Sequence, residues 1–133
     1  LVQGSSSTVN LVSILPQLEE QNVNVKVIAT ISDELFQLQP ESYRNSVLPP
    51  EALVDMMVVT TGTRRVWPAQ NVGPLTDEYS LTSDWENEWL TGGTEADVIS
   101  EAHLDTDSIL NGIKRFASDH DDRISRQRNM LAG

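Results

Sequence analysis

Residues 23–29 read Val-Asn-Val-Lys-Val-Ile-Ala, and residues 56–61 read Met-Met-Val-Val-Thr-Thr. In the first stretch β-branched residues recur at every second position, which is the period of a strand. The second stretch is largely apolar, as in a strand buried on both faces of a parallel sheet. The alternating run at 78–82 is a third candidate strand. A sheet is therefore expected at the centre of the fold.

Helical signals alternate with these strands. Apolar residues follow an approximate helical spacing over 9–18, and Pro16 within that run predicts a kink or a break. Ser32 is placed to cap a short helix. Pro40 is placed to start another helix over 41–47.

The C-terminal third continues this alternation. Thr94 precedes a helix with acidic residues in its first turn, and a last helix is expected to start near Asp107. Beyond Ser118 the chain is polar, so 119–133 is expected to be a solvated helix extension or tail of a domain spanning 1–118. Strands alternating with helices predict a three-layer α/β/α fold with a mostly parallel sheet. The apolar face of the last helix consists of Ile109, Leu110, Ile113, Phe116 and Ala117.

Composition excludes several classes of function. The chain has 133 residues, no cysteine and a net charge of −11. Without cysteine there is no disulfide, thiolate nucleophile or cysteine-rich zinc fold. The negative charge argues against nucleic acid or an anionic membrane surface as a partner. The first residue is Leu1 rather than Met, which favours a processed product or a fragment over a complete gene product.

Two clusters are candidate anion sites. The run Gly4-Ser5-Ser6-Ser7 precedes a helix, so its N–H groups and hydroxyls could hold an anion. The structural alternative, which we favour, is a strand–helix turn with a Ser/Thr cap. Arg64-Arg65 follows the strand at 56–61, where α/β folds place ligands. The structural alternative for this pair is a surface or interface ion pair, which we favour.

No catalytic or metal motif is recognisable. Phosphate-binding loops of the Walker and dinucleotide types are absent, and no serine lies in a nucleophile elbow. The acidic run starting at Asp84 resembles a calcium loop, but Trp89 stands where that loop needs glycine. His103 and His120 lack the spacing of a dedicated metal site and are read as surface residues.

Residues 32–49 resemble a segment of the transketolase C-terminal domain. That segment reads Glu-Leu-Phe, a spacer, then Tyr-Arg-x-Ser-Val-Leu-Pro, and this chain is similar in order and spacing. Two turns depart from the family pattern, because Thr60-Thr61 replaces an acidic residue and 91–95 replaces a Phe-Gly-x-Ser-Ala-Pro turn. The matching residues are Glu34, Leu35, Phe36, Tyr43, Arg44, Ser46, Leu48 and Pro49.

The resemblance implies a domain that assists catalysis without performing it. It implies a mixed sheet of about five strands, with Tyr43 and Arg44 as packing and ion-pair residues between helix and sheet. Thiamine diphosphate and Mg²⁺ would be held between other domains of a cytoplasmic, homodimeric ketol transferase. No cofactor and no catalytic residue is then expected in this chain, whose role would be dimer support and binding of a regulatory anion. The alternative is a free-standing small-ligand or protein-interaction module with the same fold.

Overall fold

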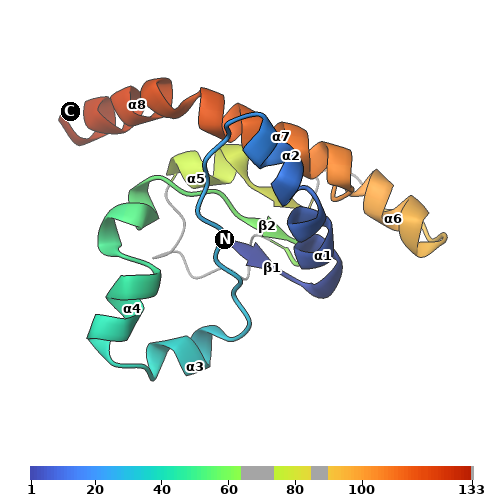
Figure 1. Ribbon diagram of the computed structural model, residues 1–133, viewed down its shortest axis with the longest axis horizontal. Coiled ribbons are helices and arrows are strands. Elements are labelled where there is room, and N and C mark those ends of the chain that lie inside the picture. The colour runs from blue at the N-terminus through green and yellow to red at the C-terminus, as the bar shows by residue number, and fades with distance from the viewer. Residues whose placement is uncertain (64–73, 85–89, 133) are drawn as a thin grey trace.

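A small parallel sheet forms the centre of the fold (Figure 1). The computed structural model describes residues 1–63, 74–84 and 90–132. Strands β1 (Val2–Gln3), β2 (Val59–Thr60) and β3 (Leu81–Thr82) pair in that order, and both pairings are parallel. The α/β class is confirmed. The expected sheet of about five strands is not, since the described residues form three.

The segment expected to be the clearest strand is extended but is not part of the ladder. With the described residues its only bridge joins Ala29 to Val2, through bonds from Val2 N to Ile28 O (2.9 Å) and from Thr30 N to Val2 O (2.8 Å). β1 has only two residues, so it offers a pairing partner to just one end of the segment. Alternating valines still pack against the core, which explains the periodicity without a full strand.

Helices α1 (Ser5–Ser13), α2 (Leu15–Glu20) and α7 (Thr106–Ser118) enclose the core beside the sheet. The chain breaks between α1 and α2 at Ile14, as the proline in the first turn of α2 predicts. The apolar face of α7 is also confirmed, because Ile109 and Ile113 are buried. The buried core consists of Val2, Leu11, Ile14, Leu18, Met57, Val59, Tyr79, Ala102, Leu104, Ile109 and Ile113.

Side-chain caps fix the starts of three helices. Ser32 Oγ accepts from Leu35 N (3.2 Å) at the start of α3 (Asp33–Gln37), as predicted. Thr94 forms a capping box at the start of α6 (Glu95–Glu101), again as predicted. The carboxylate of Asp105 accepts from Ser108 N (3.0 Å) at the start of α7. Local hydrogen-bonding chemistry therefore sets these boundaries.

The helices between α2 and β2 do not form a packed layer. α4 (Glu41–Val47) has the predicted bounds and is followed by a 3₁₀ helix, η1 (Pro50–Val54). No residue of α3, α4 or η1 is buried. The expectation of helical layers packed on both faces is therefore wrong for this part of the described chain. Short helices bounded by prolines present too little apolar surface to cover a sheet face.

The predicted strand at 78–82 begins later than expected. α5 (Pro74–Tyr79) takes its first two residues, and β3 begins at Leu81. The ring of Tyr79 packs edge-on against Phe116 of α7, with ring centroids 5.8 Å apart. The alternation of apolar and polar residues does not by itself distinguish this helix end from a strand. A contact distant in sequence, the packing of Tyr79 against α7, holds Tyr79 at the end of α5.

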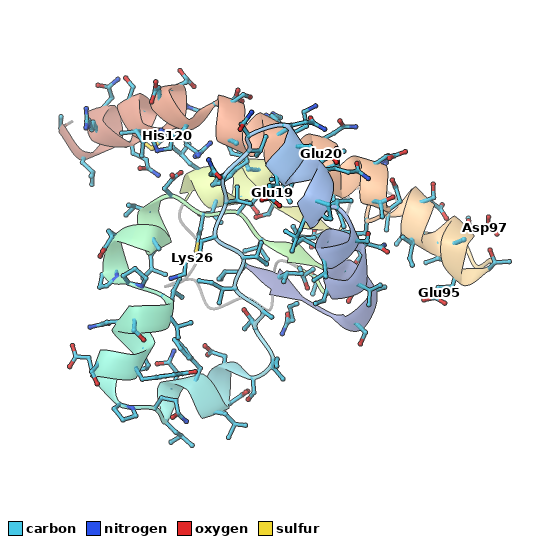
Figure 2. The ribbon with its side chains drawn as sticks, in the orientation of Figure 1. Glu19, Glu20, Lys26, Glu95, Asp97 and His120 are labelled. Atoms are coloured by element: carbon cyan, nitrogen blue, oxygen red, sulfur yellow. The ribbon has the colours of Figure 1, made fainter. Side chains whose placement is uncertain are left out.

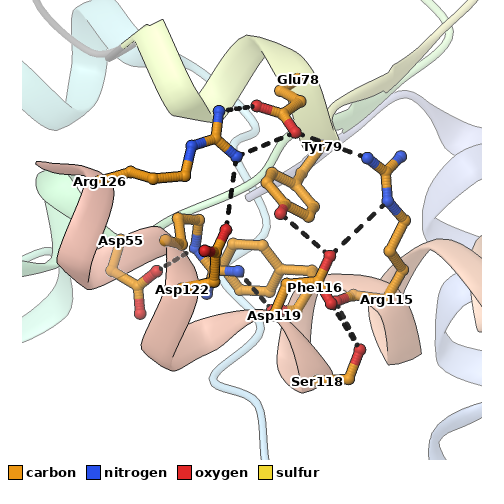
Figure 3. A network of polar contacts seen from close by, with 10 residues as sticks. Asp55, Glu78, Tyr79, Arg115, Phe116, Ser118, Asp119, Asp122 and Arg126 are labelled. Carbon is orange, nitrogen blue, oxygen red and sulfur yellow. Dashed lines mark hydrogen bonds and ion pairs between the residues drawn. The ribbon is translucent and has the colours of Figure 1, made fainter.

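Helix α8 (His120–Ala132) is attached to the fold through Arg123, next to the polar network of Asp55, Glu78 and Arg126 that Figure 3 labels. The side chain of Arg123 is only 1% exposed, although the polar composition of 119–133 predicts a solvated segment. Its Nε donates to Asp55 Oδ1 (2.7 Å), and its guanidinium lies 3.8 Å from the centre of the Phe116 ring. The domain boundary at 118 stays a prediction, but Arg123 is not solvated.

Further ion pairs surround this contact. Arg126 Nη2 lies 2.5 Å from Glu78 Oε2, and the hydrogen bond from Arg126 lowers the pKa of the Glu78 carboxyl. Tyr79 Oη donates to Asp119 Oδ2 (3.1 Å). Burial, followed by this bond to Asp119, raises the pKa of Tyr79. α8 is therefore joined to α5 and η1 by contacts distant in sequence.

Replacing Arg123 with methionine tests whether α8 depends on this buried pair. Arg123→Met leaves Asp55 without its closest cationic partner, so we expect a loss of about 3 kcal/mol in the free energy of unfolding. Urea denaturation followed by circular dichroism measures the loss. Arg128→Met, at an exposed position of the same helix, is the control and should change stability by less than about 0.5 kcal/mol. Equal losses would contradict a special role for Arg123.

Candidate functional site

The order of the strands points to one edge of the sheet as a candidate site. The chain leaves β1, returns beside it at Ala29, and then crosses to the opposite side of β1 to form β2. In open α/β sheets, ligands bind outside the carboxyl ends of the strands where the order reverses in this way. Here the edge consists of the turn after β1, residues 61–63 after β2 and residues 83–84 after β3. We call this region the carboxyl edge.

The turn after β1 depends on Gly4. Its φ of +94° lies in the region that favours glycine, and it occupies the N-cap position of α1. A Cβ at Gly4 would lie 2.3 Å from Thr61 Oγ1, which is too close for any other residue to fit without a shift. No side chain caps α1, so the expected Ser/Thr cap is wrong, and glycine occupies that position.

The structure separates the predicted anion-binding serines. Ser5 is exposed and Ser6 is half-buried at the start of α1. Ser7 is completely buried, and its Oγ has no hydrogen-bond partner. Ser7 shares a helical face with Leu11, so its side chain belongs to the core side of α1. Arg64 and Arg65 lie outside the described residues.

Hydroxyl groups dominate the rest of the carboxyl edge. Thr63 Oγ1 donates to Asp84 Oδ2 (2.7 Å), which joins the loops after β2 and β3. Ser83 Oγ donates to Thr61 O (2.9 Å) across the same gap. Thr60 Oγ1 accepts from Gly62 N (3.0 Å). The first two bonds brace the loops against each other, and the third lies within the loop after β2. The sequence had marked Asp84 only as the start of a run resembling a calcium loop, and Thr60-Thr61 only as a departure from the family pattern.

The two imidazoles lie away from this edge. His103 has a positive φ of 53° just beyond the C-terminal end of α6. His120 begins α8, where its Nε2 is 3.4 Å from Asp55 Oδ2. Among the described residues, no group of three or more His, Asp or Glu side chains is arranged to hold a metal ion. The described part of the carboxyl edge thus offers hydrogen bonds but no imidazole base.

The residues of the 32–49 motif form a separate arm, made of α3 and α4 (Figure 1). The rings of Phe36 and Tyr43 are tilted by 59° relative to each other, with centroids 6.5 Å apart. Arg44 Nη1 donates to Gln37 Oε1 (2.8 Å), and Ser46 Oγ donates to Tyr43 O (2.7 Å). Glu34 and Leu35 lie on α3, while Leu48 and Pro49 connect α4 to η1.

The expected role of Tyr43 and Arg44 between helix and sheet is wrong. Tyr43 is 52% exposed. Arg44 donates to Gln37 of the same arm, and its Nε is buried with no partner in the part of the chain that the structure describes. The motif therefore holds α3 and α4 against each other rather than against the sheet.

Comparison with known families settles the relationship of the chain. A model of the transketolase-like TK C-terminal domain matches residues 2–82. The chain belongs to this family. The match covers β1, the arm and β2, and it ends with β3, so α6, α7 and α8 of this transketolase C-terminal domain lie beyond it. A search of curated proteins finds no match. Among the described residues, no helix is long and apolar enough to cross a membrane.

Substitution of Gly4 tests the turn of this transketolase C-terminal domain. We expect Gly4→Ala to lower the free energy of unfolding by about 2 kcal/mol, because alanine disfavours the positive φ and its Cβ meets Thr61. Thermal unfolding measures the effect. Gly92→Ala is the matched control, since its Cβ would have no neighbour within 4 Å.

The double variant Gly4→Ala/Thr61→Ala separates the two causes. Removing the threonine hydroxyl relieves the collision but leaves the backbone strain, so we expect partial recovery of stability. Full stability in Gly4→Ala alone would contradict the close approach of Gly4 and Thr61.

Proposed function

We propose that the chain is the non-catalytic C-terminal domain of a transketolase-like enzyme that depends on thiamine diphosphate. The observation that supports this proposal most directly is the family match over residues 2–82. The parent enzyme would transfer two-carbon ketol groups between sugar phosphates in the cytoplasm. Thiamine diphosphate and Mg²⁺ would be held by its remaining domains, and this domain would support a homodimer.

The distribution of side chains agrees with a supporting role. At the carboxyl edge, Thr63 and Ser83 form bonds that brace neighbouring loops, and Thr60 accepts a bond within the loop after β2. The described ionic network lies instead around Arg123, where it attaches α8. This distribution of polar and charged side chains favours a domain whose charged groups stabilise its own fold.

The size of the native protein tests the proposal first. An antibody raised to this chain should detect a band well above 14.8 kDa in native extract. Immunoprecipitated protein should then transfer ketol groups between sugar phosphates when thiamine diphosphate and Mg²⁺ are supplied. A single band at 14.8 kDa without this activity would instead favour a free-standing interaction module.

Calorimetry with the isolated chain tests whether the cofactor is bound by this domain or by the other domains of the parent enzyme. We expect no saturable heat when thiamine diphosphate and Mg²⁺ are titrated into the 133-residue chain, because the cofactor would be bound by other domains. Titration of the immunoprecipitated parent enzyme provides the positive control. Tight, Mg²⁺-dependent binding by the isolated chain would contradict the proposed role.

A regulatory anion at the start of α1 is the finer part of the proposal. The support is that no side chain caps this helix, which leaves N–H groups at Ser5 and Ser6 for an anion. Inorganic phosphate should produce saturable NMR shifts at those two amides. The α7 start is an internal control because Asp105 already caps it. Equal shifts at both helix starts, or none at α1, would contradict specific binding.

A further inference from the structure

A groove of about 880 Å³ runs between the arm and the sheet. Its lining includes Leu1, Gln3 of β1, the extended segment 28–32, both helices of the arm, and Pro50 and Leu53 of η1. It is distinct from the carboxyl edge, since neither Gly4 nor the described residues of the loops after β2 and β3 (61–63 and 83–84) line it. Three properties of the groove indicate what it binds.

The first property is a free backbone edge. Segment 28–32 pairs with β1 through Ile28 O and Thr30 N. Peptide groups alternate in direction along an extended chain, so the N–H and C=O of Ala29 point away from β1. Neither group forms a hydrogen bond with the described residues. Exposed edges of this kind are where an additional strand pairs.

The second property is exposed apolar surface beside that backbone. Ile31 is 93% exposed, Leu35 is 63% exposed, and Tyr43 is half-exposed. All three line the groove. A cluster of large apolar side chains left in water marks a site for a protein partner.

The third property is charge. Among the described residues that line the groove, Asp33, Glu34 and Glu41 carry carboxylates, and Arg44 is the one cationic side chain. Hydrogen bonds from its own backbone N–H and from Ser32 lower the pKa of Glu34, so this carboxylate is ionised at neutral pH. The guanidinium already bonds to Gln37, and its buried Nε lacks an acceptor among the described residues. A complementary ligand therefore brings positive charge and free carbonyl oxygens.

We propose that this groove binds an extended segment of another protein, in which apolar side chains alternate with lysine or arginine. Its backbone pairs with Ala29, its apolar side chains cover Leu35 and Tyr43, and its cations face Glu34 and Glu41. A second copy placed groove to groove does not fit, because its Asp33, Glu34 and Glu41 would meet the same carboxylates here. The inference goes beyond the proposed function, since it holds whether or not the parent is an enzyme.

A short capped peptide that alternates lysine with valine is the probe. Titrated into the full chain and followed by NMR, it should shift amides within 28–44. It should also slow hydrogen exchange at the Ala29 amide, which only strand pairing would protect. A peptide with glutamate in place of lysine should bind at least about tenfold more weakly. Binding without protection of Ala29 would overturn strand pairing and with it the proposal.

Matched charge variants distinguish binding in the groove from general electrostatic attraction of the cationic peptide to an acidic chain. Glu34→Gln/Glu41→Gln should weaken binding by about fivefold. Glu19→Gln/Glu20→Gln removes the same charge from α2, which Figure 2 shows away from the arm, and should leave affinity nearly unchanged. Equal weakening by both pairs would overturn the proposal.

A second pair of variants tests the apolar contacts. Leu35→Ser should weaken binding by about tenfold because the peptide covers this side chain. Leu131→Ser, at an 88% exposed position on α8, should have no effect. Sedimentation of the chain alone should show monomers at the concentration of the titration. Self-association abolished by Leu35→Ser would assign the groove to a second copy and overturn the proposal.

Discussion

The backbone of Val2 joins parts of the chain that are far apart in sequence. On one side it bonds to Ile28 and Thr30, and on the other side it lies opposite Val59 of β2. Because Val2 is almost completely buried, these hydrogen bonds are protected from water. They set the strand order, and therefore place both the Gly4 turn and the departure of the chain toward the arm. The carboxyl edge and the groove are two consequences of the same pairing.

Local signals predicted helices better than strands. α4 lies at 41–47 because Pro40 starts it and the prolines after it prevent its continuation. Alternating valines at 23–27 correctly indicated an extended backbone with one side on the core, but periodicity carries no information about the length of the partner strand. The sequence placed Tyr79 in a strand for a related reason. Its position at the end of α5 depends on a tertiary contact with Phe116, which alternation does not reveal.

Sequence patterns predicted the contacts of the candidate sites less well than they predicted the helices. Arg123 and Asp55 are 68 positions apart, and an arginine in a polar helix gives no sign of burial. Glycine at position 4 was a clear signal of a turn, but its collision partner Thr61 comes from another strand end. Tyr43 and Arg44 were correctly placed within a recognisable motif, whereas their contacts within the arm could not be inferred from order and spacing.

The two candidate surfaces differ in how far the fold satisfies its own polar groups. At the carboxyl edge, Thr60, Thr63 and Ser83 are each engaged in a hydrogen bond that braces a loop. In the groove, Arg44 Nε and the peptide groups of Ala29 have no partner among the described residues, and apolar side chains beside them remain in water. Leaving a buried donor without an acceptor costs free energy. A partner that supplies carbonyl oxygens gives the donor an acceptor, and its apolar side chains remove the exposed apolar surface from water. The groove therefore offers more binding free energy to a partner than the carboxyl edge does.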